Sequence, residues 1–306
     1  MSRRRREPYH PGAVFLIDKP TGPTSHDVVR DLRRWTGLRR IGHGGTLDPL
    51  ASGLLPIFVG AATRLNEYLS PYRKHYEATV RLGQSTATDD SEGEVIASAS
   101  VPDLTSVQID AALDQFRGQI EQVPPQYSAV KRDGVAAYRS ARAGEPVEIE
   151  ARAVTVHELD VVEVAAPDVK LTMSVSTGTY VRAIARDLGA ALGCGAHVVE
   201  MRRTRIGQLD ASDGHSLDDL QAAADRDEIW SMAIPAADLF PDWPRFLLEG
   251  EQLERIKRGQ QIRHAPIDGC DRALAVTPDQ HVAAVLRRDE LSAATWQPEK
   301  VLARGA

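Results

Sequence analysis

The segment from Gly42 to Gly53, Gly-His-Gly-Gly-Thr-Leu-Asp-Pro-Leu-Ala-Ser-Gly, is the part of this chain whose backbone is most constrained. Its glycines allow positive φ angles and a close approach of the backbone to a ligand. Pro49 fixes its own φ and favours an extended conformation at Asp48, so the backbone itself aims this carboxylate. The segment predicts a loop that presents one acidic side chain; the alternative interpretation is an ordinary Asp-Pro turn.

The composition is that of a soluble globular protein with room for one large domain and a small one. The chain has 306 residues, of which 42% are hydrophobic and 26% charged, both ordinary values for this class. No apolar run reaches the roughly 20 residues that span a bilayer, and the basic N-terminus lacks the apolar core of a signal peptide. The two cysteines, Cys194 and Cys270, form no metal or disulfide pattern. We therefore expect a cytoplasmic protein without membrane contact.

Charge is unevenly distributed along the chain. The formal net charge is −6, which taken alone disfavours nucleic acid as a partner. Residues 1–45, however, contain ten Lys or Arg and four Asp or Glu, a local charge of +6, whereas residues 205–242 contain nine acidic and two basic residues, a local charge of −7. This distribution predicts a face that binds phosphates. Scattered solvated charges would give similar counts.

Apolar periodicity predicts short strands alternating with helices. Strands are expected at residues 14–20, 54–60, 76–83, 154–157 and 169–177, and helices at 24–37, 62–69, 109–116 and 182–192. The acidic segment 86–94 lacks the ligand spacing of an EF-hand, so it is interpreted as a solvated connector. A Pro-rich linker at 235–245 is expected to lead into a small β-rich module with strands at 272–276 and 282–286.

Motifs of other enzyme classes are missing from the sequence. It contains no phosphate-binding P-loop, no Rossmann fingerprint and no metalloprotease helix motif, and the nine histidines do not cluster with carboxylates at zinc spacing. A serine hydrolase elbow is also missing. The sequence therefore predicts an enzyme that needs neither metal nor cofactor.

The string Gly42–Gly53 resembles the active-site motif of the bacterial tRNA pseudouridine-55 synthases, which typically reads Gly-His-Thr-Gly-Thr-Leu-Asp-Pro-Leu-Ala. Gly44 stands where threonine is usual. Further segments match family signatures in the right order between Phe15 and Arg205: residues 16–20, 124–131, 176–182, 187–189 and 201–204. Val175, directly before the third of these segments, replaces a cysteine, and Met201 replaces a leucine.

The resemblance implies three catalytic residues. Asp48 is the expected nucleophile, and attack at C1′, attack at C6 and a glycal route all stay open. Arg182 is expected to pair with Asp48 and so to keep the carboxylate ionised and oriented. Tyr76 is expected to stack on the target uracil with its hydroxyl near the C5 proton. Without the resemblance, a surface ion pair for Arg182 and a core position for Tyr76 would be the ordinary interpretations.

Other residues would contact the RNA. The resemblance implies that Tyr180 and Met201 line the base pocket and that His43 packs where a base has been extruded. A loop histidine that only bonds the backbone is the alternative for His43. The remaining expected RNA-binding residues are basic: Lys19, Lys131, Arg202 and Arg203.

The implied fold is a mixed-sheet α/β pseudouridine synthase fold with a small C-terminal β-rich, PUA-like domain. We expect a basic tail at 1–12, a catalytic domain at 13–240 with a thumb loop at about 124–150, and an RNA-binding module at 246–306. The implied function is isomerisation of uridine 55 in the tRNA T loop by a monomer with no protein partner. Two alternatives are a tRNA-folding chaperone without essential catalysis and a guide-RNA-dependent synthase.

Overall fold

The computed structural model describes residues 10–128, 130–132, 135–145, 147–265, 267–290 and 292–303. These residues form two compact units. The first comprises residues up to Leu47, Leu54–Ser70 and Gln208 onward, and the second comprises Asp48–Gly53 and Pro71–Gly207. Most of the predicted tail at 1–12 lies outside the described residues.

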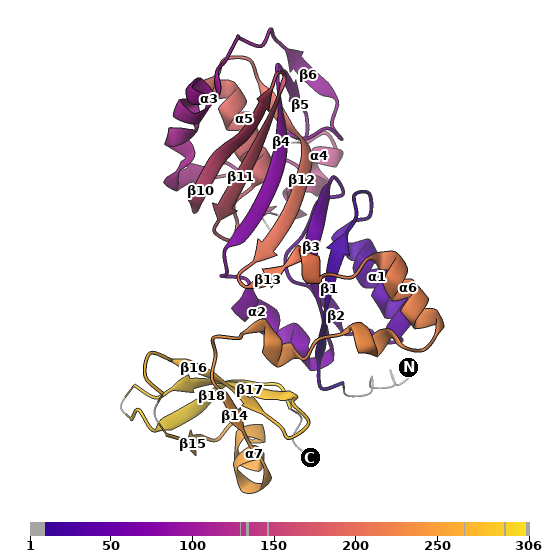
Figure 1. The fold of residues 1–306 in the computed structure, drawn as a ribbon, viewed down its shortest axis with the longest axis vertical. Helices are drawn as coiled ribbons and strands as arrows, with labels where there is room; N and C mark the ends of the chain where they lie inside the picture. The colour runs from indigo at the N-terminus through magenta and orange to yellow at the C-terminus, as the bar shows by residue number, and fades with distance from the viewer. Residues whose placement is uncertain are drawn as a thin grey trace. The chain divides into compact units, whose positions relative to one another are not determined.

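The first unit begins with strand β1 (Ala13–Lys19) and helix α1 (Ser25–Thr36), followed by β2 (Ile41–His43) and the larger part of β3 (Ala51–Val59) (Figure 1). Helix α1 starts at a capping box in which Thr24 and Asp27 bond each other's backbone, and it ends at Gly37 with φ of +70°, as capping rules predict. The chain continues through η1 (Gly60–Leu65) and α2 (Asn66–Leu69).

The remainder of the first unit contains short helices and then a small β-rich module. The helical elements are η3 (Ala211–Asp213), α6 (Leu217–Asp225), η4 (Ile229–Met232) and η5 (Ala236–Leu239). The module contains β14 (Arg245–Leu247), α7 (Gly250–Lys257), β15 (Ile262–Arg263), β16 (Arg272–Val276), β17 (Val282–Arg288) and β18 (Thr295–Val301), with sheet order β14-β16-β17-β18-β15. Its core surrounds the fully buried Trp296. The predicted β-rich C-terminal module is confirmed.

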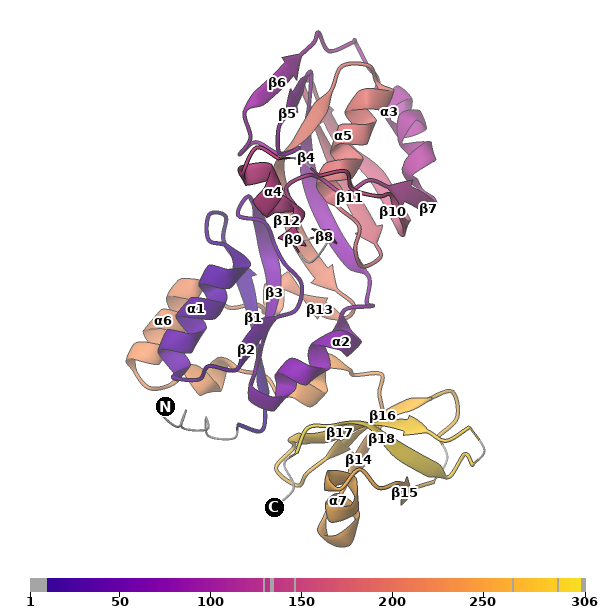
Figure 2. The same ribbon diagram turned by 180° about the vertical axis from the view of Figure 1, so that it is seen from behind.

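The second unit is built on an antiparallel sheet. Its strands follow the order β12 (Ala196–Ile206), β4 (Lys74–Leu82), β11 (Asp168–Val175), β10 (Arg152–Ala165) and β7 (Gly118–Gln122), and the start of β3 runs parallel to β12. Helices α3 (Ser106–Leu113) and α5 (Val181–Ala191) lie along one face of this sheet (Figures 1 and 2). The smaller elements are β5 (Gln84–Thr86), β6 (Val95–Ser98), η2 (Asp114–Phe116), β8 (Lys131–Arg132), β9 (Val135–Ala136) and α4 (Ala137–Arg142).

Alternation along β4 and β11 puts their apolar residues on one face of the sheet, as predicted. Tyr76, Ala78, Val80 and Leu82 of β4 are buried, whereas Glu77 between them is exposed. On β11 the residues at 169, 171, 173 and 175 are buried as well. The mixed α/β fold class is therefore confirmed.

One local expectation was wrong. The predicted loop Gly42–Gly53 is irregular only over residues 44–50, because Ile41 and His43 pair with Val59 and Ile57 and give the apolar strand β3 an antiparallel partner. The predicted linker 235–245 is packed, since Phe240 is fully buried and stacks on Trp243 with ring centroids 4.5 Å apart. No helix among the described residues is long and apolar enough to cross a membrane.

Candidate active site

The loop that carries Asp48 is fastened at its preceding residue. The buried hydroxyl of Ser25, the first residue of α1, accepts a hydrogen bond from the Leu47 amide at 2.8 Å and donates one to the Leu47 carbonyl at 2.9 Å. On the other side, the Ala51 amide donates to the Asp48 carbonyl at 3.1 Å. The backbone on both sides of the carboxylate is thus held by hydrogen bonds, and nothing in the Gly42–Gly53 string had pointed to Ser25.

Close packing explains two glycines of the string. The Gly44 amide donates to the Pro56 carbonyl at 2.7 Å, and a Cβ on Gly44 would lie 2.9 Å from the Phe58 ring. In this chain the Phe58 ring therefore fills the space that a threonine at 44 would need. Gly53 has φ of +99°, and its Cβ would lie 2.2 Å from the Arg203 carbonyl oxygen, so only glycine permits the approach of β3 to β12.

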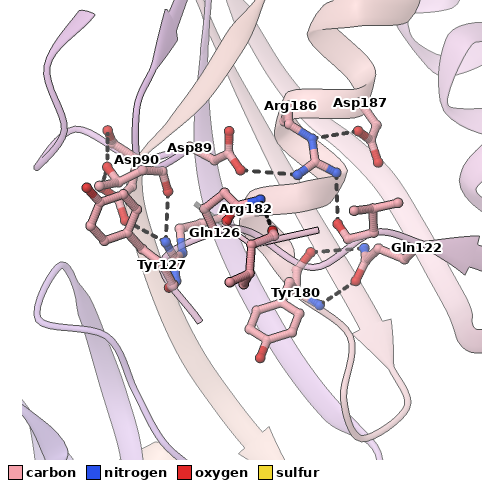
Figure 3. A network of polar contacts seen from close by, with 12 residues as sticks. Asp89, Asp90, Gln122, Gln126, Tyr127, Tyr180, Arg182, Arg186 and Asp187 are labelled. Carbon is pink, nitrogen blue, oxygen red and sulfur yellow. Dashed lines mark hydrogen bonds and ion pairs between the residues drawn. The ribbon is translucent and has the colours of Figure 1, made fainter. Parts of the chain in front are cut away.

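Arg182 enters the site from the first turn of α5. The residue before the helix proper, Tyr180, is held by the buried Gln122 side chain, which accepts from the Tyr180 amide at 2.8 Å and donates to its carbonyl at 3.1 Å (Figure 3). Tyr180 also lies under the Arg152 guanidinium, 4.7 Å from its ring centroid. Gln122 thus fixes the start of the helix that carries the arginine.

The Arg182 guanidinium contacts two carboxylates and two backbone carbonyls. Its Nη2 lies 2.9 Å from Asp48 Oδ2 and donates to the Tyr127 carbonyl at 2.8 Å. Its Nη1 lies 3.3 Å from Asp90 Oδ2 and donates to the Thr88 carbonyl at 2.8 Å. The expected pairing with Asp48 is present through Nη2. The other terminal nitrogen, Nη1, faces Asp90.

Exposure separates the two partners. The Arg182 side chain is 4% exposed, whereas the Asp48 side chain is 31% exposed. A guanidinium with fixed partners, buried beneath a half-exposed carboxylate, orients that carboxylate while leaving it accessible to a ligand. Among the described residues, Arg182 Nε is buried without a hydrogen-bond partner.

The interpretation of 86–94 as a solvated connector was wrong. Asp90 is only 3% exposed, its Oδ1 accepts from the Glu92 amide at 3.1 Å, and the Thr88 hydroxyl donates to it. The loop therefore supplies Arg182 with a second carboxylate, which unlike that of Asp48 is buried. Sequence reasoning missed it because short acidic runs are usually solvated and because its partner lies far along the chain.

A second arginine of α5 holds the neighbouring carboxylate. Arg186 Nη1 lies 3.2 Å from Asp89 Oδ2, its Nε lies 2.8 Å from Asp187 Oδ1, and its Nη2 donates to the Val123 carbonyl at 2.9 Å (Figure 3). Burial raises the pKa of Asp89, while Arg186 and, more weakly, Arg182 act in the opposite direction. Neither Arg186 nor Asp89 was a candidate from sequence.

Strand register brings two further predicted residues, Tyr76 and Met201, to one face of the sheet. Tyr76 is the cross-strand partner of Arg203 on β12, and Met201 is the partner of Ala78, the next buried position of β4. Tyr76 and Met201 are each 8% exposed. Lys74, on the same face of β4, is buried, and this burial together with the charge of Arg203 lowers its pKa to about 8.

Of the basic residues expected to bind RNA, two are buried and one is half-buried. Lys19 is fully buried, and its ammonium donates to the carbonyls of Pro20 at 2.8 Å and Pro23 at 2.9 Å, so it holds a turn and does not face solvent. Arg203 is buried as well. Arg202 is half-buried on the opposite face of β12, opposite Glu77. The side chain of Lys131, on β8, lies outside the described residues.

His43 belongs to the first unit, as Lys19 does. It is half-buried on β2, and its ring packs edge-on against that of His26, with centroids 5.9 Å apart. Within the part of the chain that the structure describes, no group of three or more His, Cys, Asp or Glu could hold a metal ion.

Two family models match the chain in succession. The N-terminal domain of TruB family pseudouridylate synthases matches residues 33–181, and the tRNA pseudouridylate synthase B C-terminal domain matches residues 182–234. A protein of Thermobifida fusca named tRNA pseudouridine synthase B is 47% identical over 257 residues, covering 81% of this chain and 86% of that protein. The chain belongs to the TruB family of pseudouridylate synthases. It is thus a member of an enzyme family.

Other relatives cover still more of this TruB-family chain. A Burkholderia pseudomallei protein of the same name is 41% identical over 299 residues, covering 96% of this chain and 97% of that protein. Among solved structures, an H/ACA ribonucleoprotein bound to a substrate RNA containing 2′-deoxyuridine includes a chain with TM-score 0.70 and 25% identity, covering 95% of this chain and 85% of that one. A Cbf5–Nop10–Gar1 complex gives TM-score 0.69 and 25% identity, covering 99% and 92%.

Proposed function

We propose that this protein isomerises uridine 55 in the T loop of tRNA to pseudouridine, with Asp48 as the nucleophile. The C1′–N1 bond of the nucleotide breaks, the uracil turns, and C5 bonds to C1′ and then loses its proton. The observation that carries the proposal is the half-exposed Asp48 carboxylate held by the buried Arg182 guanidinium. The names of the relatives, tRNA pseudouridine synthase B, support tRNA as the substrate.

The other side chains take supporting roles in this proposal. The target base is flipped out of the RNA, which costs roughly a few kcal/mol. Stacking on Tyr76, with Tyr180 and Met201 as pocket walls, offsets part of this cost. His43 packs in the space that the base has left. Arg202 and Lys131 contribute positive charge to RNA binding, whereas the buried Lys19 and Arg203 act on the protein's own backbone and on the site.

In this proposal, three parts of the chain have separate roles in catalysis and RNA binding. Residues 13–240 act as the catalytic domain, the segment at about 124–150 acts as a thumb against the T stem-loop, and residues 246–306 act as a PUA-like RNA-binding module. The β-rich sheet of that module supports the last assignment.

A purified-protein assay tests the reaction. Unmodified T stem-loop transcript carrying uridine tritiated at C5 is incubated with the purified chain alone, and released tritium is counted. We expect release from the wild type and none above background from Asp48→Asn, while tRNA affinity in a filter-binding assay stays within about threefold, because the amide keeps the shape of the carboxylate but cannot attack. Turnover by Asp48→Asn would disprove the role of Asp48.

One structural likeness favours a second candidate. Because the similar solved chains occur in H/ACA ribonucleoprotein assemblies, a guide-RNA-dependent synthase is the alternative mode of action. The same assay separates the modes: release without added RNA or protein supports the stand-alone enzyme, whereas release only after addition of a guide RNA supports the alternative. Binding and refolding of tRNA with no release at all would indicate a chaperone.

A further inference from the structure

Two arginines of α5 and the carboxylates around them form one cluster (Figure 3). Arg182 and Arg186 are four residues apart and therefore lie on the same side of the helix. Arg182 contacts Asp48 and Asp90, and Arg186 contacts Asp89 and Asp187. Because Asp89 and Asp90 are consecutive residues, each arginine holds one of two adjacent carboxylates of the same loop.

The Asp89 carboxylate, which Arg186 holds at 3.2 Å, lies within electrostatic reach of Arg182. The charge of Arg182 already lowers the pKa of Asp89, against the stronger effect of burial. Without Arg186, this half-buried carboxylate would keep only Arg182 as a nearby cation among the contacts described for it. A carboxylate without a partner in a partly buried site is energetically unfavourable, and an ion pair with a remaining cation reduces that cost.

The backbone limits how the loop can respond. Asp89 has φ of +60°, an uncommon conformation for a residue other than glycine, and its carbonyl accepts from the Val198 amide of β12 at 3.1 Å. With its backbone fixed to the sheet, Asp89 can adjust mainly by rotating its side chain.

We propose that Arg186 is a positioning residue. Its ion pair with Asp89 compensates the charge of that carboxylate, so that Arg182 keeps its contacts with Asp48 and Asp90. It touches none of the reacting atoms. Its contact with the Val123 carbonyl adds a second effect, because residues 123–127 lead to the Tyr127 carbonyl that Arg182 also holds. This inference rests on the proposed role of Asp48.

The test is a pair of substitutions whose effects should oppose each other. Arg186→Met keeps the apolar stem and removes the charge, and we expect the single-turnover rate at saturating tRNA to fall about tenfold, with affinity for tRNA unchanged within about twofold. Asp89→Asn alone should stay within about twofold of the wild type. In the double variant, loss of the competing charge should restore at least half of the lost rate on a logarithmic scale.

Opposite results would overturn the proposal. If Arg186 only anchored the loop, the double variant would be as slow as Arg186→Met or slower, and an unchanged rate in Arg186→Met would refute any role. Arg186→Lys, which keeps the charge, should lie closer to the wild type than Arg186→Met. Arg81→Met is the matched control, because it removes an arginine of the same unit whose partner is Asp168, and it should leave the rate unchanged.

Two outcomes must be kept apart. A wild-type protein that forms no pseudouridine, or an active Asp48→Asn variant, would refute the proposed function. An inactive Asp48→Asn variant together with no rescue by Asp89→Asn would refute only the role of Arg186. Circular dichroism melting curves of each variant show that it is folded under assay conditions.

Discussion

At the scale of single residues, the site depends on the geometry of one guanidinium. Arg182 donates in two directions at once, toward Asp48 and Tyr127 with Nη2 and toward Asp90 and Thr88 with Nη1. A planar fork with fixed donor directions suits this arrangement, and a lysine ammonium at the end of a flexible chain does not. We therefore expect the shape of the residue to matter in addition to its charge.

Arg182→Lys tests this conclusion. We expect the rate of pseudouridine formation to fall by about a hundredfold, because one ammonium cannot reach both Asp48 and Asp90 and the nucleophile loses its orientation. Single-turnover tritium release at saturating tRNA measures the effect. A rate within threefold of the wild type would show that positive charge alone is sufficient.

A second single residue, Lys74, makes the stability of the protein depend on pH. Its pKa of about 8 in the folded protein lies below the value of 10.5 expected without burial. Between about pH 8 and about pH 10.5 the unfolded chain therefore binds more protons at this site than the folded chain, so stability rises with pH in this window. The full effect is about 3 kcal/mol, from about 1.4 kcal/mol per pKa unit.

Lys74→Met removes that rise. We expect the free energy of unfolding in urea, measured from pH 7.5 to 10.5, to gain about 3 kcal/mol less with pH in Lys74→Met than in the wild type. Lys170→Met is the control, because pairing with Glu163 raises the pKa of Lys170 and no such rise is expected from it. Parallel curves for the wild type and Lys74→Met would contradict the low pKa.

At the scale of elements, patterns that act within a few residues were predictable from the sequence. The Thr24 cap and Gly37 stop of α1, the alternation of β4 and β11, and the strand at 272–276 all depend on local chemistry. The buried Asp90 and the buried Lys19 were not predictable, because both are charged residues that become favourable only through partners supplied by the fold. Arg186 and Gln122 were missed for the same reason, because their partners are supplied by the fold.

The Ser25 hydroxyl binds helix α1 to Leu47, the residue that precedes Asp48. Ser25 bonds both backbone groups of Leu47, so Ser25→Ala leaves a buried amide and carbonyl without their partner. We expect a loss of about 1–2 kcal/mol in stability and a fall in rate of about tenfold, since Asp48 follows directly in the chain.

The control for Ser25→Ala lies at the other end of the same helix. Thr36→Val removes a hydroxyl that donates to the Leu32 carbonyl at 2.7 Å and accepts from the Leu38 amide at 3.3 Å, at the opposite end of α1 from the Ser25–Leu47 hydrogen bonds. Chemical denaturation and tritium release on both variants separate stability from rate. A Ser25→Ala protein that is destabilised but has the wild-type rate would show that the bond has no role in positioning Asp48.

At the scale of the whole molecule, the negative net charge disfavours the proposed binding of RNA. A chain of net charge −6 should be repelled by nucleic acid, so binding has to come from local basic clusters. Helix α1 carries exposed arginines, among them Arg34. Neutralising phosphates releases counterions, which makes affinity fall with salt in proportion to the number of phosphate contacts.

Salt titration of tRNA binding therefore reports on this basic cluster. We expect the logarithm of affinity to fall linearly with the logarithm of salt concentration. Arg34→Ala should reduce the slope by the contribution of one phosphate contact, about 0.7–0.9. Arg226→Ala is the matched control: it removes an exposed arginine of the acidic stretch, paired with Glu228, and should leave the slope unchanged. Equal slopes for all three proteins would show that phosphates are bound elsewhere, and a flat wild-type curve would contradict a phosphate-binding face altogether.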